Sequence, residues 1–148
     1  MRRILVSLAA AALLVGGVAG PATAVNGGAP RVAALSGLDN VPLVNPGGSG
    51  FASLTLNVGQ QRVCWSISYE SLSSTATASH IHRAPPGSNG PVVVPLNPNE
   101  DGCRSADPAL IQEIIDYPER FYVNVHTTAH PGGEIRGQLS NPGQSNQS

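Results

Sequence analysis

The sequence predicts an all-β domain, an antiparallel β-sandwich with one short crossover helix. Apolar and polar residues alternate strictly through segments 51–58 and 62–69, which is the period of strands that bury one face. The 148 residues include 17 Gly and 13 Pro and only 11% are charged, a composition typical of a β-rich extracellular domain with many turns. A helical period occurs between Asp107 and Pro118.

The first 24 residues are predicted to be a secretory signal peptide and not part of the fold. Arg2 and Arg3 give a positive start, residues 4–18 are apolar, and a small-x-small cleavage site ends at Ala24. The alternative is a transmembrane anchor, but the apolar run is short for a bilayer. Cleavage near Ala24 predicts a secreted or extracytoplasmic protein with no transmembrane segment in the mature chain.

The strands follow in order after a flexible lead-in over residues 25–30. The residues between 51–58 and 62–69 are only Gly59, Gln60 and Gln61, so these two segments are predicted to pair as a hairpin. The other predicted strands are bounded by Gly, Pro and Asn clusters and span 31–35, 77–84, 91–96, 121–128 and 134–139. Residues 97–106 are expected to form a loop.

The one predicted helix begins at Asp107, whose side chain can cap it, and Pro108 suits its first turn. Its apolar residues lie on one stripe and are Leu110, Ile111, Ile114 and Ile115. Pro118 ends it, so the helix crosses the sandwich and leads into the strand at Phe121. Residues 140–148 have little to bury and are predicted to be a disordered tail.

Two cysteines, Cys64 and Cys103, are expected to form a disulfide in an oxidising compartment. The bond would close a loop of about 40 residues and contribute roughly 3 to 4 kcal/mol through loop entropy. The alternative is a pair of free or metal-binding thiols.

The mature chain carries a small negative charge. Without Arg2 and Arg3 it has six arginines against nine acidic residues and no lysine, a net charge of −3. Nucleic acid and anionic membranes are poor partners for such a surface.

All four histidines lie in two motifs, His80-x-His82 and His126-x3-His130. Residues at i and i+2 of a strand point the same way, so His80 and His82 can hold one metal ion, and a histidine from a neighbouring strand would complete a copper or zinc set. These four residues are therefore the candidate ligands of a metal site. The alternative is that each histidine makes a structural hydrogen bond, for instance to Asn124 or Glu134.

The recognised catalytic motifs are missing from the sequence. It has no G-x-S-x-G elbow, no Gly-rich phosphate loop that opens a helix and, with both cysteines paired, no free thiol nucleophile. The spacing of Ser, His and Asp selects no triad. The sequence therefore favours a non-enzymatic role and assigns no catalytic residue.

Several separated motifs occur in the order of one known family. They are Ala34–Gly37 with Val41-Pro42, Gly48–Ala52, Ser79–His82, Gly90–Val93, Tyr122–Thr127 and His130–Leu139. Over residues 31–139 the chain resembles the CHRD domain, which is named for chordin, an animal extracellular antagonist of bone morphogenetic proteins. The resemblance implies an extracellular β-sandwich module without established catalysis. The chain departs from the family pattern in its cysteine pair and at Arg83, where a small residue is expected and where a long one could crowd a site beside His82.

A remoter resemblance bears on the metal site. The His80-Ile81-His82 strand, a later histidine, a disulfide and the segment 132–137 are similar in outline to the copper/zinc superoxide dismutases. Their bridging histidine and zinc-binding aspartate have no counterpart that we can place. The resemblance implies an immunoglobulin-like or superoxide dismutase-like sandwich with a single copper or zinc site using His80, His82 and His126, and His130 as a fourth ligand.

The leading functional prediction is a secreted, non-enzymatic binding or structural module of unassigned ligand, for which an extracellular or envelope protein is a candidate partner. The alternative is a copper-binding protein with redox or dismutase-like activity. The two differ in one observation, because only a metal protein should lose its activity when the histidines are replaced.

Overall fold

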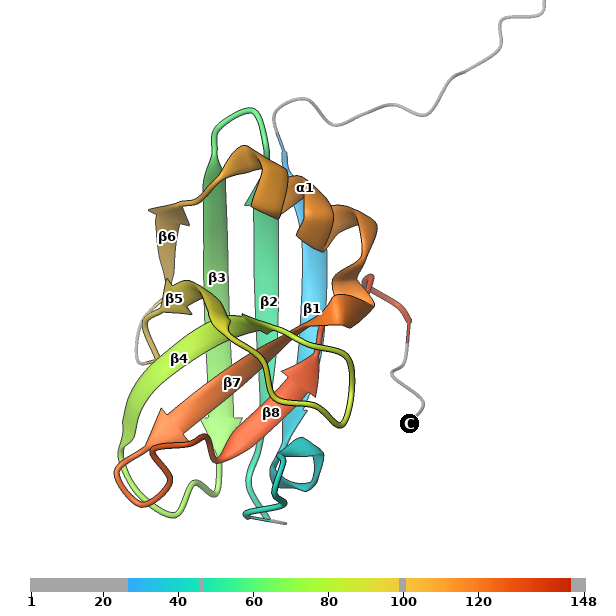
Figure 1. Ribbon diagram of the computed structural model, residues 1–148. Coiled ribbons are helices and arrows are strands. Elements are labelled where there is room, and N and C mark those ends of the chain that lie inside the picture. The colour runs from blue at the N-terminus through green and yellow to red at the C-terminus, as the bar shows by residue number, and fades with distance from the viewer. Residues whose placement is uncertain (1–26, 46, 99–100, 145–148) are drawn as a thin grey trace, which may run out of the picture.

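The computed structural model describes residues 27–45, 47–98 and 101–144, which form eight antiparallel strands and one short α-helix (Figure 1). The strands make one curled, nearly closed barrel-like sheet in the order β5-β4-β7-β8-β1-β2-β3-β6. Their bounds are β1 Ala29–Ser36, β2 Ser49–Asn57, β3 Arg62–Glu70, β4 Ala76–Arg83, β5 Val92–Leu96, β6 Gly102–Ser105, β7 Phe121–Thr127 and β8 Ile135–Gln138. The all-β, antiparallel prediction with one short helix is confirmed.

The pairing of β1 with β8 joins the two halves of the expected sandwich into one sheet. Ser36 pairs with Arg136, and an isolated bridge joins Val32 to Ser140. Gly137 allows this approach, because a Cβ at that position would lie 1.9 Å from the carbonyl oxygen of Ala34. The sheet therefore curls around a single core, with β4, β7 and β8 lying over β1, β2 and β3 (Figure 1).

The core is built from the inward faces of the strands and from the helix. The alternation predicted for β2 and β3 is present, since Leu54, Leu56 and Val63 are buried, and so is the hairpin that joins these strands. Ile67 and Tyr69 are only partly buried, and β6 covers β3 only from Arg62 to Trp65.

The helix α1, Pro108–Asp116, lies across one end of the barrel (Figure 1). The Asp107 side chain caps it by accepting a hydrogen bond of 2.7 Å from the backbone N–H of Ala109. Ile111 and Ile114 are fully buried in the core. A 3-10 turn at Pro118–Arg120 then leads into β7, as predicted.

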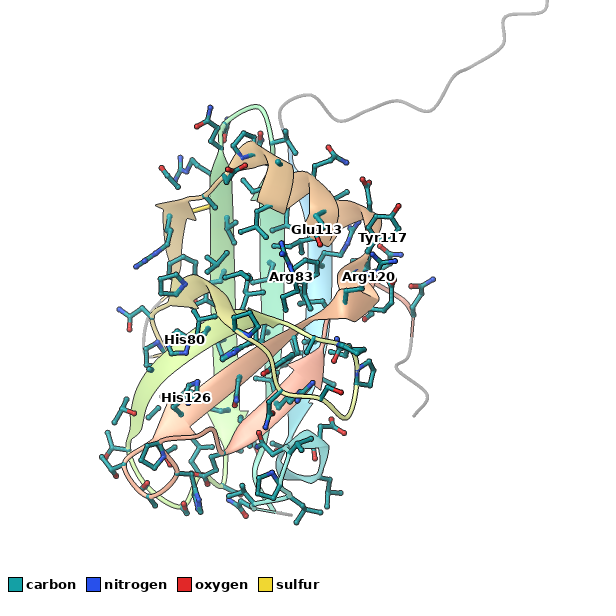
Figure 2. The ribbon with its side chains drawn as sticks, viewed as in Figure 1. His80, Arg83, Glu113, Tyr117, Arg120 and His126 are labelled. Atoms are coloured by element: carbon teal, nitrogen blue, oxygen red, sulfur yellow. A yellow bond between two sulfur atoms is a disulfide. The ribbon has the colours of Figure 1, made fainter. Side chains whose placement is uncertain are left out.

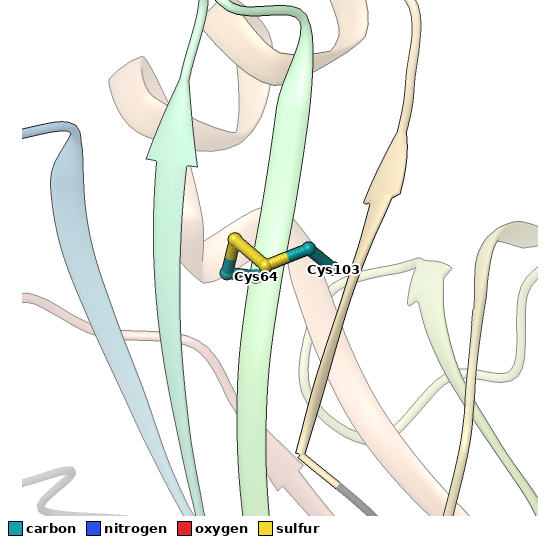
Figure 3. Close-up of a disulfide and its surroundings, with 2 residues drawn as sticks. All are labelled: Cys64 and Cys103. Carbon is teal, nitrogen blue, oxygen red and sulfur yellow. A yellow bond between two sulfur atoms is a disulfide. The ribbon is translucent and has the colours of Figure 1, made fainter.

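The segment predicted as a loop over residues 97–106 contains the short strand β6. Its four residues, GCRS, do not alternate between apolar and polar, so the sequence pattern does not indicate a strand there. Cys103 lies directly opposite Cys64 on β3, and the two form the expected disulfide (Figure 3).

The ends of the domain extend slightly beyond the predicted bounds. β1 begins at Ala29, which pairs with Leu56, and Ser140 still contacts β1 through Val32. The predicted signal peptide, the first two residues of the lead-in and the last four tail residues lie outside the described residues, and Ala29 and Pro30 of the expected flexible lead-in belong to β1. Among those described, no helix is long and apolar enough to cross a membrane.

A buried carboxylate ties together three segments beside the β7–β8 turn. The Glu134 side chain, fully buried, accepts hydrogen bonds from Asn45 Nδ2 at 2.7 Å, Ser73 N at 2.5 Å, Ser73 Oγ at 2.9 Å and Thr127 Oγ1 at 2.6 Å. Burial alone would raise the pKa of Glu134, but the bonds from Thr127, Ser73 and Asn45 outweigh it and hold that pKa below its ordinary value. The ionised form of Glu134 therefore stabilises the fold.

Removing the disulfide should destabilise the domain without changing its fold. Replacing Cys64 and Cys103 together by alanine should lower the free energy of unfolding by roughly 2–4 kcal/mol, because the unfolded chain regains the entropy of a loop spanning 39 positions. Urea denaturation followed by circular dichroism measures this, with Ser66→Ala on the same strand as control. An unchanged midpoint in the double variant would contradict the expectation.

Replacing Glu134 should give a stability loss that depends on pH. Glu134→Gln replaces one acceptor oxygen of the carboxylate by an NH₂ group, which faces donors that need an acceptor. It should lower the free energy of unfolding by about 2–4 kcal/mol at pH 7. Because the folded pKa of Glu134 is lowered, its stabilisation is present above the unfolded value of about 4.3 and fades as pH falls through the folded value. The difference in unfolding free energy between wild type and variant should therefore be smaller at pH 3 than at pH 7. Denaturation curves at both pH values measure it. The exposed Glu70→Gln is the control, and an equal gap at both pH values would count against this role.

Candidate metal centre

The pairing of β4 with β7 brings three of the four histidines onto the outer face of the barrel. Ile81 on β4 and Val123 and Val125 on β7 are fully buried in the core, so the residues between them point outward. His80 pairs with Asn124, His82 with Tyr122 and Ala78 with His126, which makes His126 a diagonal neighbour of His80. The predicted shared face of His80 and His82 thus meets His126 from the next strand.

The loop between β4 and β5 covers part of this outer face and crosses β7 and β8 in Figure 1. His82 and His126 are therefore buried despite lying outside the core, whereas His80 is only half-buried. The cluster is protected on one side and reaches solvent through His80.

The three imidazoles are close enough to share one ion. One nitrogen from each of His80, His82 and His126 lies within 4.8 Å of the other two, and this is the one such group of His, Cys, Asp or Glu among the described residues. His80 Nδ1 and His126 Nε2 are 2.9 Å apart (Figure 2). Metal–nitrogen bonds of about 2.0–2.1 Å would bring bound nitrogens within about 4.1 Å of each other, so small ring rotations suffice.

Backbone carbonyls fix the tautomers of two of the rings. His82 Nδ1 lies 2.9 Å from the carbonyl oxygen of Gly90, and His126 Nδ1 lies 2.9 Å from that of Pro131. A carbonyl only accepts, so each Nδ1 carries the proton and each Nε2 presents a lone pair. His82 Nε2 is buried and has no hydrogen-bond partner in the described structure. Metal-binding histidines have this arrangement, in which the other ring nitrogen is held by a carbonyl or carboxylate.

The surroundings of His80 and His82 keep these two imidazoles neutral. Burial, with the nearby His126 and His82, lowers the pKa of His80 from 6.5 to about 4. Burial also lowers the pKa of His82, and the charges of His126 and Arg136 add to this, while the Gly90 carbonyl opposes it. Neutral imidazole is the form that binds a metal, so these two ligands are ready at neutral pH.

The fourth predicted ligand, His130, lies in the β7–β8 turn and is not part of the three-histidine group. Its backbone carbonyl accepts from Gly133 N at 3.0 Å, and its N–H donates to Thr127 Oγ1 at 3.1 Å. The backbone of His130 therefore helps to shape the turn that carries the Pro131 carbonyl.

Arg83 does not crowd the cluster. Its guanidinium pairs with Glu113 of α1 at 2.5 Å, as Figure 2 shows, and lies 5.4 Å from the Phe121 ring centroid. Being one residue after His82 on a strand, it points to the other side.

The supporting residues were not predicted from the sequence. The ring partners are the carbonyls of Gly90 and Pro131 and not the side chains of Asn124 or Glu134. Any residue has a carbonyl, so no residue type marks these two positions. Asn124 Oδ1 is itself buried without a hydrogen-bond partner in the described structure, which leaves a second lone pair without a donor on this face.

The comparison with protein families gives a match to the CHRD domain over residues 31–139. The comparisons with curated proteins and with solved structures gave no match. The matched range runs from β1 to the residue after β8, and so includes both strands that carry the cluster.

Proposed function

The chain belongs to the CHRD domain family, and on that premise we propose that it is an exported protein that binds one copper or zinc ion through His80, His82 and His126. The observation that carries the proposal is the convergence of three imidazoles, two of which have Nδ1 fixed on a carbonyl and Nε2 left as a lone pair.

A purely structural role explains this cluster less well. Leaving the buried His82 Nε2 without a partner costs about 1–3 kcal/mol. The unpartnered Asn124 Oδ1 on the same face is also an acceptor. Lone pairs without donors are what a cation satisfies.

The donor set favours copper or zinc. Imidazole nitrogens suit both ions, and neither a thiolate nor a carboxylate belongs to the group. Three protein ligands leave a further position for water or a small exogenous ligand, reached past the half-buried His80. If the bound ion is copper, it would supply redox chemistry at that open position. Dismutation is then the activity to assay.

Metal content tests the proposal directly. Protein purified from the exported fraction should hold close to one copper or zinc ion per chain by mass spectrometry, and the apo form should bind that ion in a titration. His82→Ala should weaken binding by more than the 10–100-fold typical of residues that only orient a ligand. His130→Ala, the matched control outside the group, should bind as wild type. A metal-free chain with no binding tighter than about micromolar, roughly −8 kcal/mol, would refute the site.

We further propose, as a second function, that the domain is a binding module for an extracellular or envelope protein. A disulfide between Cys64 and Cys103 is compatible with an extracytoplasmic location. The loop before β2 exposes Leu38 and Leu43 by more than half, and a groove of about 1160 Å³ adjoins Leu38. Exposed apolar side chains beside a groove favour protein contact.

The two functions can be separated by variants. If the module acts through this loop, replacing Leu38 and Leu43 together by serine should abolish recovery of an envelope partner in a pull-down, while His82→Ala should leave recovery unchanged. Recovery of nothing above background by the wild-type chain would count against the binding module, and loss of recovery with His82→Ala would make the partner depend on the metal.

A further inference from the structure

Tyr122 lies against a member of the histidine cluster in a stacked geometry. Its ring and that of His82 are 4.7 Å apart between centroids and only 7° from parallel. Tyr122 stands opposite His82 in the register of β4 and β7. Direct cross-strand neighbours of this kind restrict each other's rotamers.

Arg136 contacts the same tyrosine from the next strand. Its Cζ lies 3.5 Å from the centroid of the Tyr122 ring. β8 and β4 flank β7 on opposite sides, so His82 and Arg136 reach Tyr122 from its two neighbouring strands. The result is a row of three planar groups across β4, β7 and β8.

The contacts of Arg136 do not include an ion pair in the described structure. The side chain is 2% exposed and donates to the carbonyl of Pro85 at 3.2 Å and to Asn89 Oδ1 at 3.4 Å. Burying a guanidinium with only neutral oxygens as hydrogen-bond partners has a desolvation cost, which its contact with the Tyr122 ring face partly offsets. Arg136 and the Tyr122 ring are therefore packed against each other.

Gly90 links the tyrosine to the His82 tautomer. Its N–H donates to Tyr122 Oη at 3.3 Å, and its carbonyl accepts from His82 Nδ1 at 2.9 Å. A Cβ at this position would lie 1.9 Å from the carbonyl oxygen of Arg83, so only glycine fits there. The same residue thus touches both stacked rings.

We propose that Tyr122, clamped by Arg136, is a positioning residue for His82: the stack sets the plane of the imidazole, so that the ring holds Nδ1 on the Gly90 carbonyl and Nε2 faces His80 and His126. This inference deepens the proposed metal function and rests on it for its metal-binding consequence. The orientation of His82 itself is a property of the metal-free chain.

The first test reads the apo protein. Long-range ¹H–¹⁵N NMR of the imidazoles should show wild-type His82 as a single Nδ1–H tautomer. Tyr122→Leu, which removes the ring, should give a mixture of tautomers, whereas Tyr122→Phe, which keeps the stack, should stay close to wild type. A wild-type His82 that carries its proton on Nε2, or that samples both tautomers, overturns the inference.

The second test adds Cu²⁺ to the same proteins. Tyr122→Leu should weaken Cu²⁺ binding by about 10–100-fold and alter the electron paramagnetic resonance spectrum, and Tyr122→Phe should restore both. Arg136→Gln should shift affinity in the same direction by about two- to fivefold, and it serves if Tyr122→Leu does not fold. Tyr117→Leu is the matched control, because Tyr117 also packs under an arginine, with Arg120 Cζ at 4.3 Å, on a different part of the molecule (Figure 2).

The outcomes separate the two proposals. Unchanged affinity and spectrum in folded Tyr122→Leu overturn the positioning role while leaving the metal site intact. A wild-type chain that binds neither copper nor zinc refutes the metal function, and the apo tautomer of His82 then still decides whether Tyr122 positions it.

Discussion

The antiparallel pairing of β4 with β7 is the constraint on which the candidate site depends. Its register places Ile81 and Val123 in the core and, by the period of two, His80, His82 and His126 on the opposite face. A slip of one residue would exchange these sets and put imidazoles into the barrel interior. The apolar core therefore specifies the position of the histidines, although none of them belongs to it.

Loops held by non-local hydrogen bonds complete the arrangement. The β4–β5 loop, which supplies the Gly90 carbonyl, is tied down where Asn89 Nδ2 donates to the carbonyl of Val41 at 2.7 Å. The β7–β8 turn, which supplies the Pro131 carbonyl, is followed at once by the buried Glu134 and its four hydrogen bonds. Each fixed ring thus depends on a loop that is anchored to a distant part of the chain, so the site is a product of the whole fold rather than of the two histidine motifs.

These dependences explain what the sequence could and could not predict. Alternation and turn residues located seven of the eight strands, and the cap at Asp107 located the helix, because those signals are local. The strand β6 was predicted as a loop because its four residues have no apolar face. The closure of the sheet through β1 and β8 was not predicted, because neither segment carries a local pattern that identifies a partner about a hundred residues away.

The same distinction applies to the site. The His80-x-His82 spacing predicts two rings on one face, and a third ring from a neighbouring strand was expected because it would complete a copper or zinc ligand set. The predicted strand over 121–128 includes His126 and leaves His130 beyond its end, but the spacing could not show whether the turn brings His130 back to the other histidines. The stack of Tyr122 and Arg136 on His82 involves three strands, and no motif in the sequence relates these residues to one another.

Because the histidine cluster lies outside the apolar core, the barrel does not need a bound ion in order to fold. A zinc finger has too little core to fold alone, so its ion supplies the folding free energy. In the described part of this chain, 18 buried hydrophobic residues form a core inside the barrel, and the histidine cluster lies outside it. Binding an ion would displace the hydrogen bond between His80 and His126, a cost of about 0.5–1.5 kcal/mol, which is small beside the roughly 10–16 kcal/mol of structural zinc sites. The barrel therefore serves as a preformed frame for two fixed imidazoles, and in the proposed site His80, which has no backbone carbonyl partner on its ring in the described structure, is the ligand that would adjust.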